Sequence, residues 1–185
     1  THSEHGMILQ DNQYGTLEED AWRRDFTVNA LYYNIRDFSI VDYTGGVADI
    51  KAKQIRIIGK PEQRFREDPV RILRAIRFSS VLDMPIGSAT GKPIPHLLPM
   101  LSNVSPARLF DEIVKLFHSG ASEQVWRQFK HYGLTKLFFQ QTLAAADEYP
   151  AEQLIEHVLV NTDDRVAAGK SVTPVFVLAC LLWYP

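Results

Sequence analysis

The chain has 185 residues, of which 45% are hydrophobic and 23% are charged, and its formal net charge at pH 7 is −2. This length suits one large domain or two small ones, and the composition is that of a globular protein with ample material for a core. The small net charge argues against a uniformly basic nucleic-acid-binding protein. The charge is uneven, however, because residues 51–80 carry nine basic side chains against three acidic ones. A basic strip within an otherwise acidic chain is therefore predicted.

Cysteine content and hydropathy indicate a reducing compartment. Cys180 is the single cysteine of the sequence, so no disulfide can form within the chain, which fits the cytoplasm. The longest apolar run, residues 175–184, is about half the length that a membrane span needs. The sequence begins without methionine and stops inside this apolar run. We therefore expect a piece of a longer cytoplasmic polypeptide.

The first sixty residues predict a mixture of helices and strands. A short strand is expected at residues 7–9, after which "TLEE" forms a capping box with Thr16 as N-cap and Glu19 three residues later. The helix that follows is predicted to continue to Asn29. The β-rich segments "ALYYNI" and "FSIVDY" predict an antiparallel hairpin, "TGGVADIKAK" a turn with a short helix, and "QIRII" a third strand.

From residue 61 onward the pattern is helical. "DPVRILRAIRFSSVL" predicts a helix with Asp68 as N-cap and Pro69 at its first position. A Gly/Pro-rich connector at residues 83–99 precedes "SPARLFDEIVKLFHSG", which predicts a helix from Ser105 to Gly120. Three further helical segments complete the chain, and the predicted fold class is α+β.

The first candidate site is the segment "RRDFTVN". In a helix, Asp25 and Asn29 would share one face. Arg23 and Arg24 would point about 100° apart around the helix axis. Guanidinium groups suit phosphate oxygens and a carboxylate suits ribose hydroxyls, so the segment could hold a nucleotide. The alternative to a nucleotide site is an ordinary surface ion pair, which this segment alone does not exclude.

The second candidate site is "RFREDPVRILRAIRF". It combines two acids, Glu67 and Asp68, with a row of arginines at Arg71, Arg74 and Arg77. A carboxylate and a guanidinium at fixed separation can read the hydrogen-bonding edge of a nucleobase. The alternative is structural, with Asp68 capping the helix and Arg71 pairing with Glu67.

Taken together, the two segments resemble a known family. "RRDFTVNALYY", followed about forty residues later by "REDPVRILRAIRF", is similar to the class II nucleotidyltransferases, which comprise bacterial poly(A) polymerases and CCA-adding tRNA enzymes. "GMILQDNQYGTLEEDAWRRDFTVNALYY", "DYTGGVADI", "SPARLFDEIVKLF" and "LLWYP" resemble the poly(A) polymerase branch in particular. The resemblance covers nearly the whole chain.

The resemblance implies roles for individual residues. Asp25 is implied as a catalytic acid. Nucleotide contacts are implied for Arg23, Arg24, Asp25, Asn29, Glu67, Asp68, Arg71 and Arg74. We expect RNA contacts from the basic strip, at Lys60, Arg64, Arg66 and Arg77. The implied organisation is the C-terminal part of a nucleotidyltransferase head (residues 1–60), a helical neck with base-selecting and RNA-binding elements (61–120) and the start of a helical body (121–185).

The sequence departs from the family at its metal site. The family holds two magnesium ions with a D-x-D pair on a strand, because alternate carboxylates of a strand point to the same side. That pair is absent here, since Asp163 and Asp164 are adjacent. We therefore expect no metal ligands within this chain, with Mg²⁺ bound mainly by other residues, and no activity from the chain alone. The scattered histidines also make a zinc site unexpected.

The implied activity of the longer protein is template-independent addition of adenylate from ATP to RNA 3′ ends, in the cytoplasm. Two alternatives stay open at this point. A CCA-adding tRNA nucleotidyltransferase shares both motifs, and a non-catalytic RNA-binding helical module would need neither acid nor metal.

Overall fold

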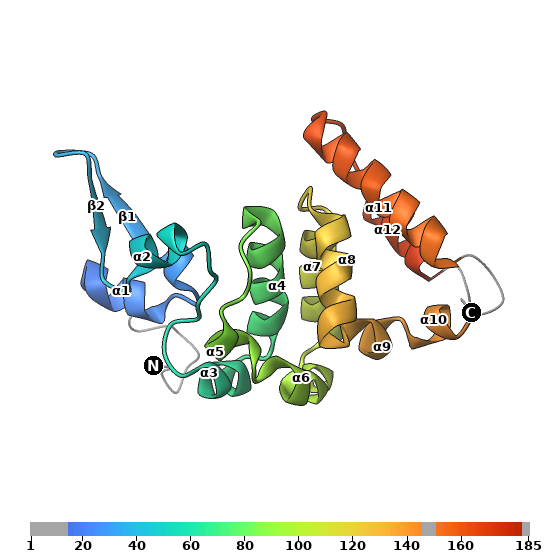
Figure 1. Ribbon diagram of the computed structural model, residues 1–185, viewed down its shortest axis with the longest axis horizontal. Coiled ribbons are helices and arrows are strands. Elements are labelled where there is room, and N and C mark those ends of the chain that lie inside the picture. The colour runs from blue at the N-terminus through green and yellow to red at the C-terminus, as the bar shows by residue number, and fades with distance from the viewer. Residues whose placement is uncertain (1–14, 146–150, 183–185) are drawn as a thin grey trace, which may run out of the picture.

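The computed structural model describes residues 15–145 and 151–182, and the strand predicted at residues 7–9 lies outside them. The elements follow one another along an elongated molecule (Figure 1). A hairpin with α1 and α2 forms one end, α4 lies near the middle, and α11 and α12 form the other end. A two-stranded antiparallel sheet and a majority of helix confirm the predicted α+β class.

The first helix, α1 (Leu17–Arg23), has the predicted capping box. Thr16 Oγ1 accepts from the Glu19 amide at 3.2 Å, and Glu19 Oε2 accepts from the Thr16 amide at 2.8 Å. The predicted continuation to Asn29 is wrong, because the backbone becomes extended at Arg24. Phe26 is fully buried and pairs with Ile57 in an isolated bridge. Burial of the Phe26 ring in the core outweighs the helical propensity of this segment, which explains why the helix does not continue.

The hairpin is confirmed. A short 3-10 turn, η1 (Thr27–Asn29), leads into β1 (Leu31–Asn34), which pairs antiparallel with β2 (Ser39–Asp42), with Leu31 opposite Asp42. The predicted third strand is wrong, because Ile55 and Ile57 form only isolated bridges, to Ile86 and Phe26 respectively.

A sharp turn connects β2 to α2 (Gly46–Lys51), as predicted from "TGGVADIKAK". The Asp42 carboxylate accepts hydrogen bonds from the four consecutive amides of residues 44–47, at 2.8–3.1 Å. Burial opposes ionisation of Asp42, but the amides of Val47, Gly46, Thr44 and Gly45 outweigh it and hold its pKa below the usual value.

The helical part begins with α3 (Pro61–Glu67) and α4 (Val70–Leu82). Asp68 and Pro69 both precede α4, so the predicted start is one residue early, yet Asp68 Oδ1 still accepts from the Val70 amide at 3.3 Å. The predicted connector contains two single-turn helices, α5 (Ser88–Gly91) and α6 (Ile94–Leu97), followed by η2 (Leu98–Asn103).

The remaining helices lie in the part of the chain, from residue 61 onward, that was predicted to be helical, although α9 and α10 were not predicted individually. Ser105 precedes α7 (Pro106–Phe117), which ends three residues before the predicted Gly120, and Gly133 is the C-cap of α8 (Ser122–Tyr132). The others are α9 (Leu134–Phe138), α10 (Gln140–Ala145), α11 (Ala151–Ala167) and α12 (Pro174–Leu181). Asp163 of α11 caps α8, because its two oxygens accept from the Ser122 and Glu123 amides at 2.8 and 3.1 Å.

One hydrophobic cluster runs through most of the described chain. It includes Phe26 and Ile57 near the hairpin, Ile72 on α4, Trp126 on α8 and Leu181 on α12. Trp126 is 1% exposed and is therefore a core residue. The division at residues 60 and 120 stays a prediction.

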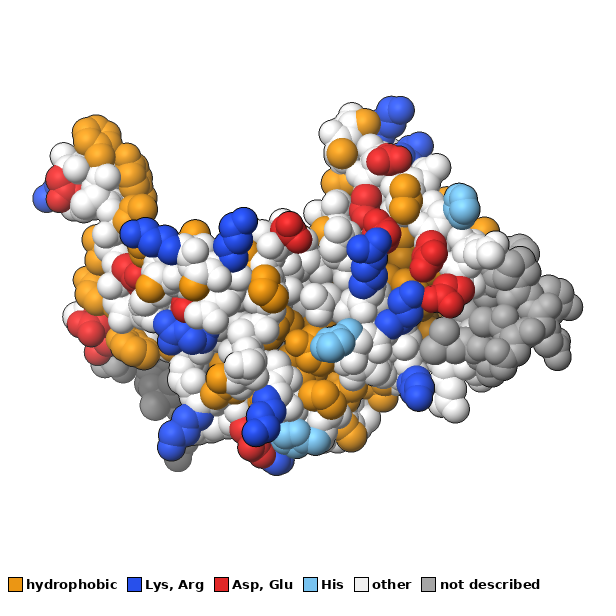
Figure 2. All heavy atoms as spheres, in the orientation of Figure 1, with side chains coloured by type: hydrophobic (Ala, Val, Ile, Leu, Met, Phe, Trp, Pro, Cys, Tyr) orange, Lys and Arg blue, Asp and Glu red, His pale blue; other side chains and the backbone are white. Residues whose placement is uncertain are grey.

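The hairpin carries an exposed apolar surface. Tyr33, Ile35, Phe38 and Ile40 are all more than half exposed. Hydrophobic side chains accordingly line the projection at the upper left of Figure 2. Within residues 15–145 and 151–182, no helix combines the length and the hydrophobicity that crossing a membrane would take.

Candidate nucleotide-binding site

The two candidate motifs meet at Asp25, whose carboxylate lies among three arginines. Its Oδ1 is 2.8 Å from Arg71 Nε and 3.9 Å from Arg64 Nη2, and its Oδ2 is 2.5 Å from Arg74 Nη1. Asp25 is 7% exposed. Burial in a low-dielectric environment strengthens these attractions and makes an unpaired charge costly. We call these four residues the Asp25 cluster.

Backbone contacts hold this arrangement in place. Asp25 lies in the extended segment after α1, where its carbonyl oxygen accepts from the Ile58 amide at 2.9 Å. Arg64 of α3 donates to the Arg24 carbonyl at 3.0 Å, and Arg71 of α4 donates through Nη1 to the Arg64 carbonyl at 2.8 Å. The end of α3 and the start of α4 are therefore tied to the segment that carries Asp25.

Glu67 borders the Asp25 cluster on the solvent side. Its Oε2 lies 3.1 Å from Arg64 Nη1 and 3.3 Å from Arg71 Nη1. Donation from Gln63, followed by the charges of Arg64 and Arg71, holds the pKa of Glu67 below the usual value. Two carboxylates against three guanidinium groups leave a formal surplus of one positive charge, which favours an anionic ligand.

Asp68 is directed to a different partner. Its Oδ2 accepts from Arg108 Nη2 of α7 at 2.7 Å, so this predicted nucleotide-contacting acid joins the start of α4 to α7. Sequence reasoning did not identify Arg108. No local pattern could have found it, because it lies 40 residues from Asp68.

Among the described residues, the side chains of Arg23, Arg24 and Asn29 form no ion pair or hydrogen bond with the Asp25 cluster. Arg24 pairs with Asp20 at 3.0 Å, and its guanidinium carbon lies 5.8 Å from the centroid of the Tyr32 ring. The carboxylate that compensates Arg24 is therefore Asp20 and not Asp25. Asn29 Oδ1 accepts from the Phe26 amide at 3.2 Å within η1, so the predicted helical face shared by Asp25 and Asn29 is wrong.

The predicted RNA-binding residues differ in their availability. Lys60 is exposed, whereas Arg66 pairs with Glu62 at 2.8 Å and Arg64 belongs to the Asp25 cluster. The guanidinium carbon of Arg77 lies 5.0 Å from the Phe78 ring centroid. Its Nε is buried without a hydrogen-bond partner among the described residues. An open depression of about 610 Å³ is lined by Lys60, Glu62, Gln63, Arg66 and Glu67.

A magnesium ion does not fit the described side chains. Within residues 15–145 and 151–182, no three acidic, histidine or cysteine side chains gather at a point where they could hold a metal ion. Both oxygens of Asp25 face arginines, and Asp163 caps a helix. No reaction step is therefore assigned to a metal held by these residues.

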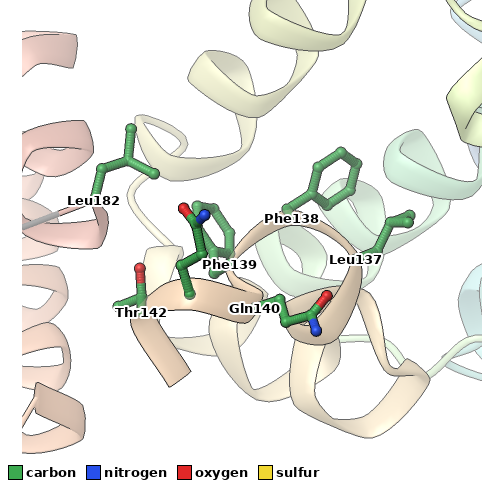
Figure 3. Close-up of a pocket in the computed structure, with 7 residues that line it drawn as sticks. Leu137, Phe138, Phe139, Gln140, Thr142 and Leu182 are labelled. Atoms are coloured by element: carbon green, nitrogen blue, oxygen red, sulfur yellow. The ribbon is translucent and has the colours of Figure 1, made fainter. Parts of the chain in front are cut away.

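A further cavity of about 340 Å³ lies between α9, α10 and α12. Figure 3 shows Phe138, Phe139 and Gln140 on one side and Leu182 on the other. Its lining has no charged side chain. A nucleoside triphosphate requires cationic partners, so the Asp25 cluster is the better candidate for a nucleotide site.

Comparison with known families matches two parts of the chain. Residues 2–56 match the family described as "Poly A polymerase head domain". Residues 83–145 match the family described as "Probable RNA and SrmB- binding site of polymerase A". The Asp25 segment falls within the first match, and Arg108 falls within the second.

Curated relatives extend this similarity over the whole chain. Poly(A) polymerase I of Escherichia coli O6:H1 is 45% identical over 185 residues, covering 98% of this chain and 40% of the relative. That of Haemophilus influenzae is 47% identical, covering 99% and 41%. The CCA-adding enzyme of Bacillus subtilis is 38% identical over 157 residues, covering 79% of this chain and 39% of the relative. The chain thus spans about two fifths of the length of these relatives.

Solved structures of similar fold include CCA-adding enzymes. An apo form matches with a TM-score of 0.70 and 27% identity, covering 98% of this chain and 45% of the other. A CCA-adding enzyme in complex with ATP matches with a TM-score of 0.69 and 28% identity, covering 90% and 40%. With its poly(A) polymerase head and RNA-binding matches and its relatives of 45–47% identity, the chain belongs to the nucleotidyltransferase family, in the poly(A) polymerase branch.

Proposed function

We propose that the protein containing this chain transfers adenylate from ATP to the 3′ end of RNA without a template. The observation that carries the proposal is the direct contact between Asp25 of "RRDFTVN" and Arg71 of "REDPVRILRAIRF". Two segments that are 46 residues apart, and that each suggested a nucleotide contact, form one charged cluster. Two relatives of 45% and 47% identity, both named Poly(A) polymerase I, support the same activity.

In the proposed reaction, the RNA 3′ hydroxyl releases its proton to solvent and its oxygen attacks the α-phosphorus of ATP. A new phosphodiester bond forms, the bond to the β-phosphate oxygen breaks, and pyrophosphate leaves with that electron pair. The protein contributes orientation and charge neutralisation. The surplus positive charge of the Asp25 cluster together with Glu67 favours a triphosphate beside it, and a contact between the exposed Arg23 side chain and the phosphates is part of this proposal. Any magnesium requirement belongs to residues other than those described.

Base selection is assigned to the start of α4. Arg71 uses Nε and Nη1 for contacts within the protein, which leaves Nη2 to donate to a base. Glu67 and Arg74 border the same space, while Asp68 acts through Arg108. Asp25 forms ion pairs with three guanidinium groups, so its proposed catalytic contribution is to orient these groups toward the nucleotide.

RNA binding is assigned to the basic side chains on α3 and α4 together with the segment that matches the RNA-binding family. Lys60, Arg66 and Arg77 would contact backbone phosphates. Each phosphate neutralised on a single strand adds about −0.7 to the slope of log affinity against log salt. Substituting Lys60 should therefore reduce that slope by about this amount.

The activity is tested with the complete gene product, a labelled RNA primer of generic sequence and each nucleoside triphosphate in turn. The expected product is a long tail formed from ATP alone. The enzyme itself is expected to reside in the cytoplasm. Addition of CTP and then ATP that stops after three nucleotides would instead establish the CCA-adding alternative. RNA binding without incorporation of any nucleotide would establish a binding module. The 185-residue chain alone is expected to be inactive.

The role of Arg71 is tested by exchanging it for alanine. Arg71→Ala should reduce the preference for ATP over the other nucleotides by about tenfold, because one hydrogen bond from a charged donor contributes about 1.5 kcal/mol, and should leave the KM for RNA nearly unchanged. Arg165→Ala is the matched control, because it removes an exposed arginine of α11 that has no proposed role in either site. An equal loss for all four nucleotides would refute base reading by Arg71.

A further inference from the structure

Asp49 is a buried carboxylate that none of the proposed roles uses. It lies on α2 and is 3% exposed. Its Oδ2 accepts from Thr27 Oγ1 at 2.6 Å and from Arg56 Nε at 2.8 Å, and its Oδ1 accepts from Gln54 Nε2 at 2.9 Å. A buried carboxylate with three side-chain donors is a fixed point in the structure, because leaving any of these groups unpaired would be costly.

The partners of Asp49 belong to two segments that run alongside each other. Thr27 lies two residues after Asp25, and its amide donates to the Arg56 carbonyl at 3.0 Å. The Ile58 amide donates in turn to the Asp25 carbonyl at 2.9 Å, and Phe26 pairs with Ile57 between these two contacts. Asp49 therefore binds one side chain from each of the two segments, and the backbone hydrogen bonds between these segments position Asp25.

Close packing between α2 and η1 also restricts the movement of these two segments. A methyl group on Gly46 would lie 2.3 Å from the Thr27 carbonyl oxygen, so α2 approaches η1 as closely as its backbone permits. Arg56 also donates through Nη2 to the Thr44 carbonyl at 2.9 Å. The turn at residues 42–49 is thereby joined to both segments.

We propose that Asp49 is a positioning residue of the nucleotide site, acting through Thr27 and Arg56 to fix the Asp25 carboxylate among its arginines. This inference rests on the proposed function. The nucleotide itself does not contact Asp49, since the side chain is buried. A shift of segment 25–27 would change the directions of the Arg71 and Arg74 guanidinium groups. The efficiency of ATP use should therefore decrease more than the affinity for RNA.

The test uses Asp49→Asn and Thr27→Val in the complete gene product. Asp163→Asn is the matched control, because it also removes a carboxylate that accepts two hydrogen bonds, but at the start of α8. Asp49→Asn should lower kcat/KM for ATP about tenfold and leave the KM for RNA within about twofold. Thr27→Val should act in the same direction, and it carries the test if Asp49→Asn does not fold. In an Asp25→Asn background, Asp49→Asn should have little further effect on ATP use.

Two outcomes would overturn the inference. One is an equal fall in the use of ATP and RNA, and the other is a fall no larger than that of Asp163→Asn. Amide hydrogen exchange at residues 27 and 58 separates this inference from the proposed function. Faster exchange in Asp49→Asn, together with a wild-type protein that incorporates no nucleotide, would refute the transferase activity but support the positioning. Unchanged exchange would refute the positioning whatever the activity.

Discussion

Asp25→Asn tests the central feature of the site, because it removes one charge and keeps the size of the side chain. The carboxylate is 7% exposed and lies 2.8 Å from Arg71, 2.5 Å from Arg74 and 3.9 Å from Arg64. Removing one member of a buried ion pair costs ~3–5 kcal/mol, because the remaining charge is left uncompensated. The Arg74 side chain is 32% exposed, so water recovers part of that loss. We therefore expect a fall of about 3 kcal/mol in the free energy of unfolding.

Equilibrium denaturation in urea measures this change, with melting temperature as a second readout. For a protein of this size, a loss of that magnitude corresponds to a decrease of about 6–12 °C. Glu62→Gln is the matched control, because it breaks an ion pair with Arg66 in which both side chains are more than half exposed. Such exposed pairs contribute up to ~1 kcal/mol. If Asp25→Asn cost no more than Glu62→Gln, the argument that a buried charge organises the three arginines would be wrong.

Two further substitutions probe the turn that carries α2. Gly46→Ala should destabilise the protein by ~1–3 kcal/mol in the same urea assay, because the added methyl group would overlap the Thr27 carbonyl oxygen. Gly87→Ala, whose nearest contact is the end of a flexible side chain at 3.1 Å, should change little, and equal losses would contradict the packing argument. Asp42→Asn should cost about 1.5–3 kcal/mol at pH 7, because the ionised form accepts from four amides. The folded-state pKa of Asp42 lies below its unfolded value of 3.8, so this difference should persist above that value and vanish as the pH falls through the folded pKa; a difference independent of pH would refute the role of the charge.

Local chemistry in the sequence predicted the local elements well. Thr16 and Glu19 satisfy each other's backbone groups within a single turn, so their pattern alone defines the start of α1. The hairpin follows similarly from two β-rich segments separated by a short turn. Both features depend on residues that are close in sequence, which is why spacing was sufficient.

Features that depend on contacts between residues distant in the sequence could not be predicted from it. The helix predicted to Asn29 ends at Arg23, because Phe26 is buried against residues from elsewhere in the chain. The contact between Asp25 and Arg71 brings the two motifs together, although these residues lie 46 positions apart in the sequence. The partner of Asp68, Arg108, could not be read from its surroundings, since many arginines were equally available in the sequence. The partner of Arg24, by contrast, is Asp20, only four residues away.

The cap that Asp163 provides for α8 bears on where this polypeptide can be cut. The family match for RNA binding ends at residue 145, whereas the carboxylate that secures the first turn of α8 comes from eighteen positions beyond that limit. Ser122 also donates to the Leu159 carbonyl, and both Ile155 and Leu159 are buried in the shared core. A segment trimmed to the matched boundary would keep its basic side chains but lose the support beneath them. Biochemists who wish to isolate an RNA-binding portion should therefore retain α11 in full.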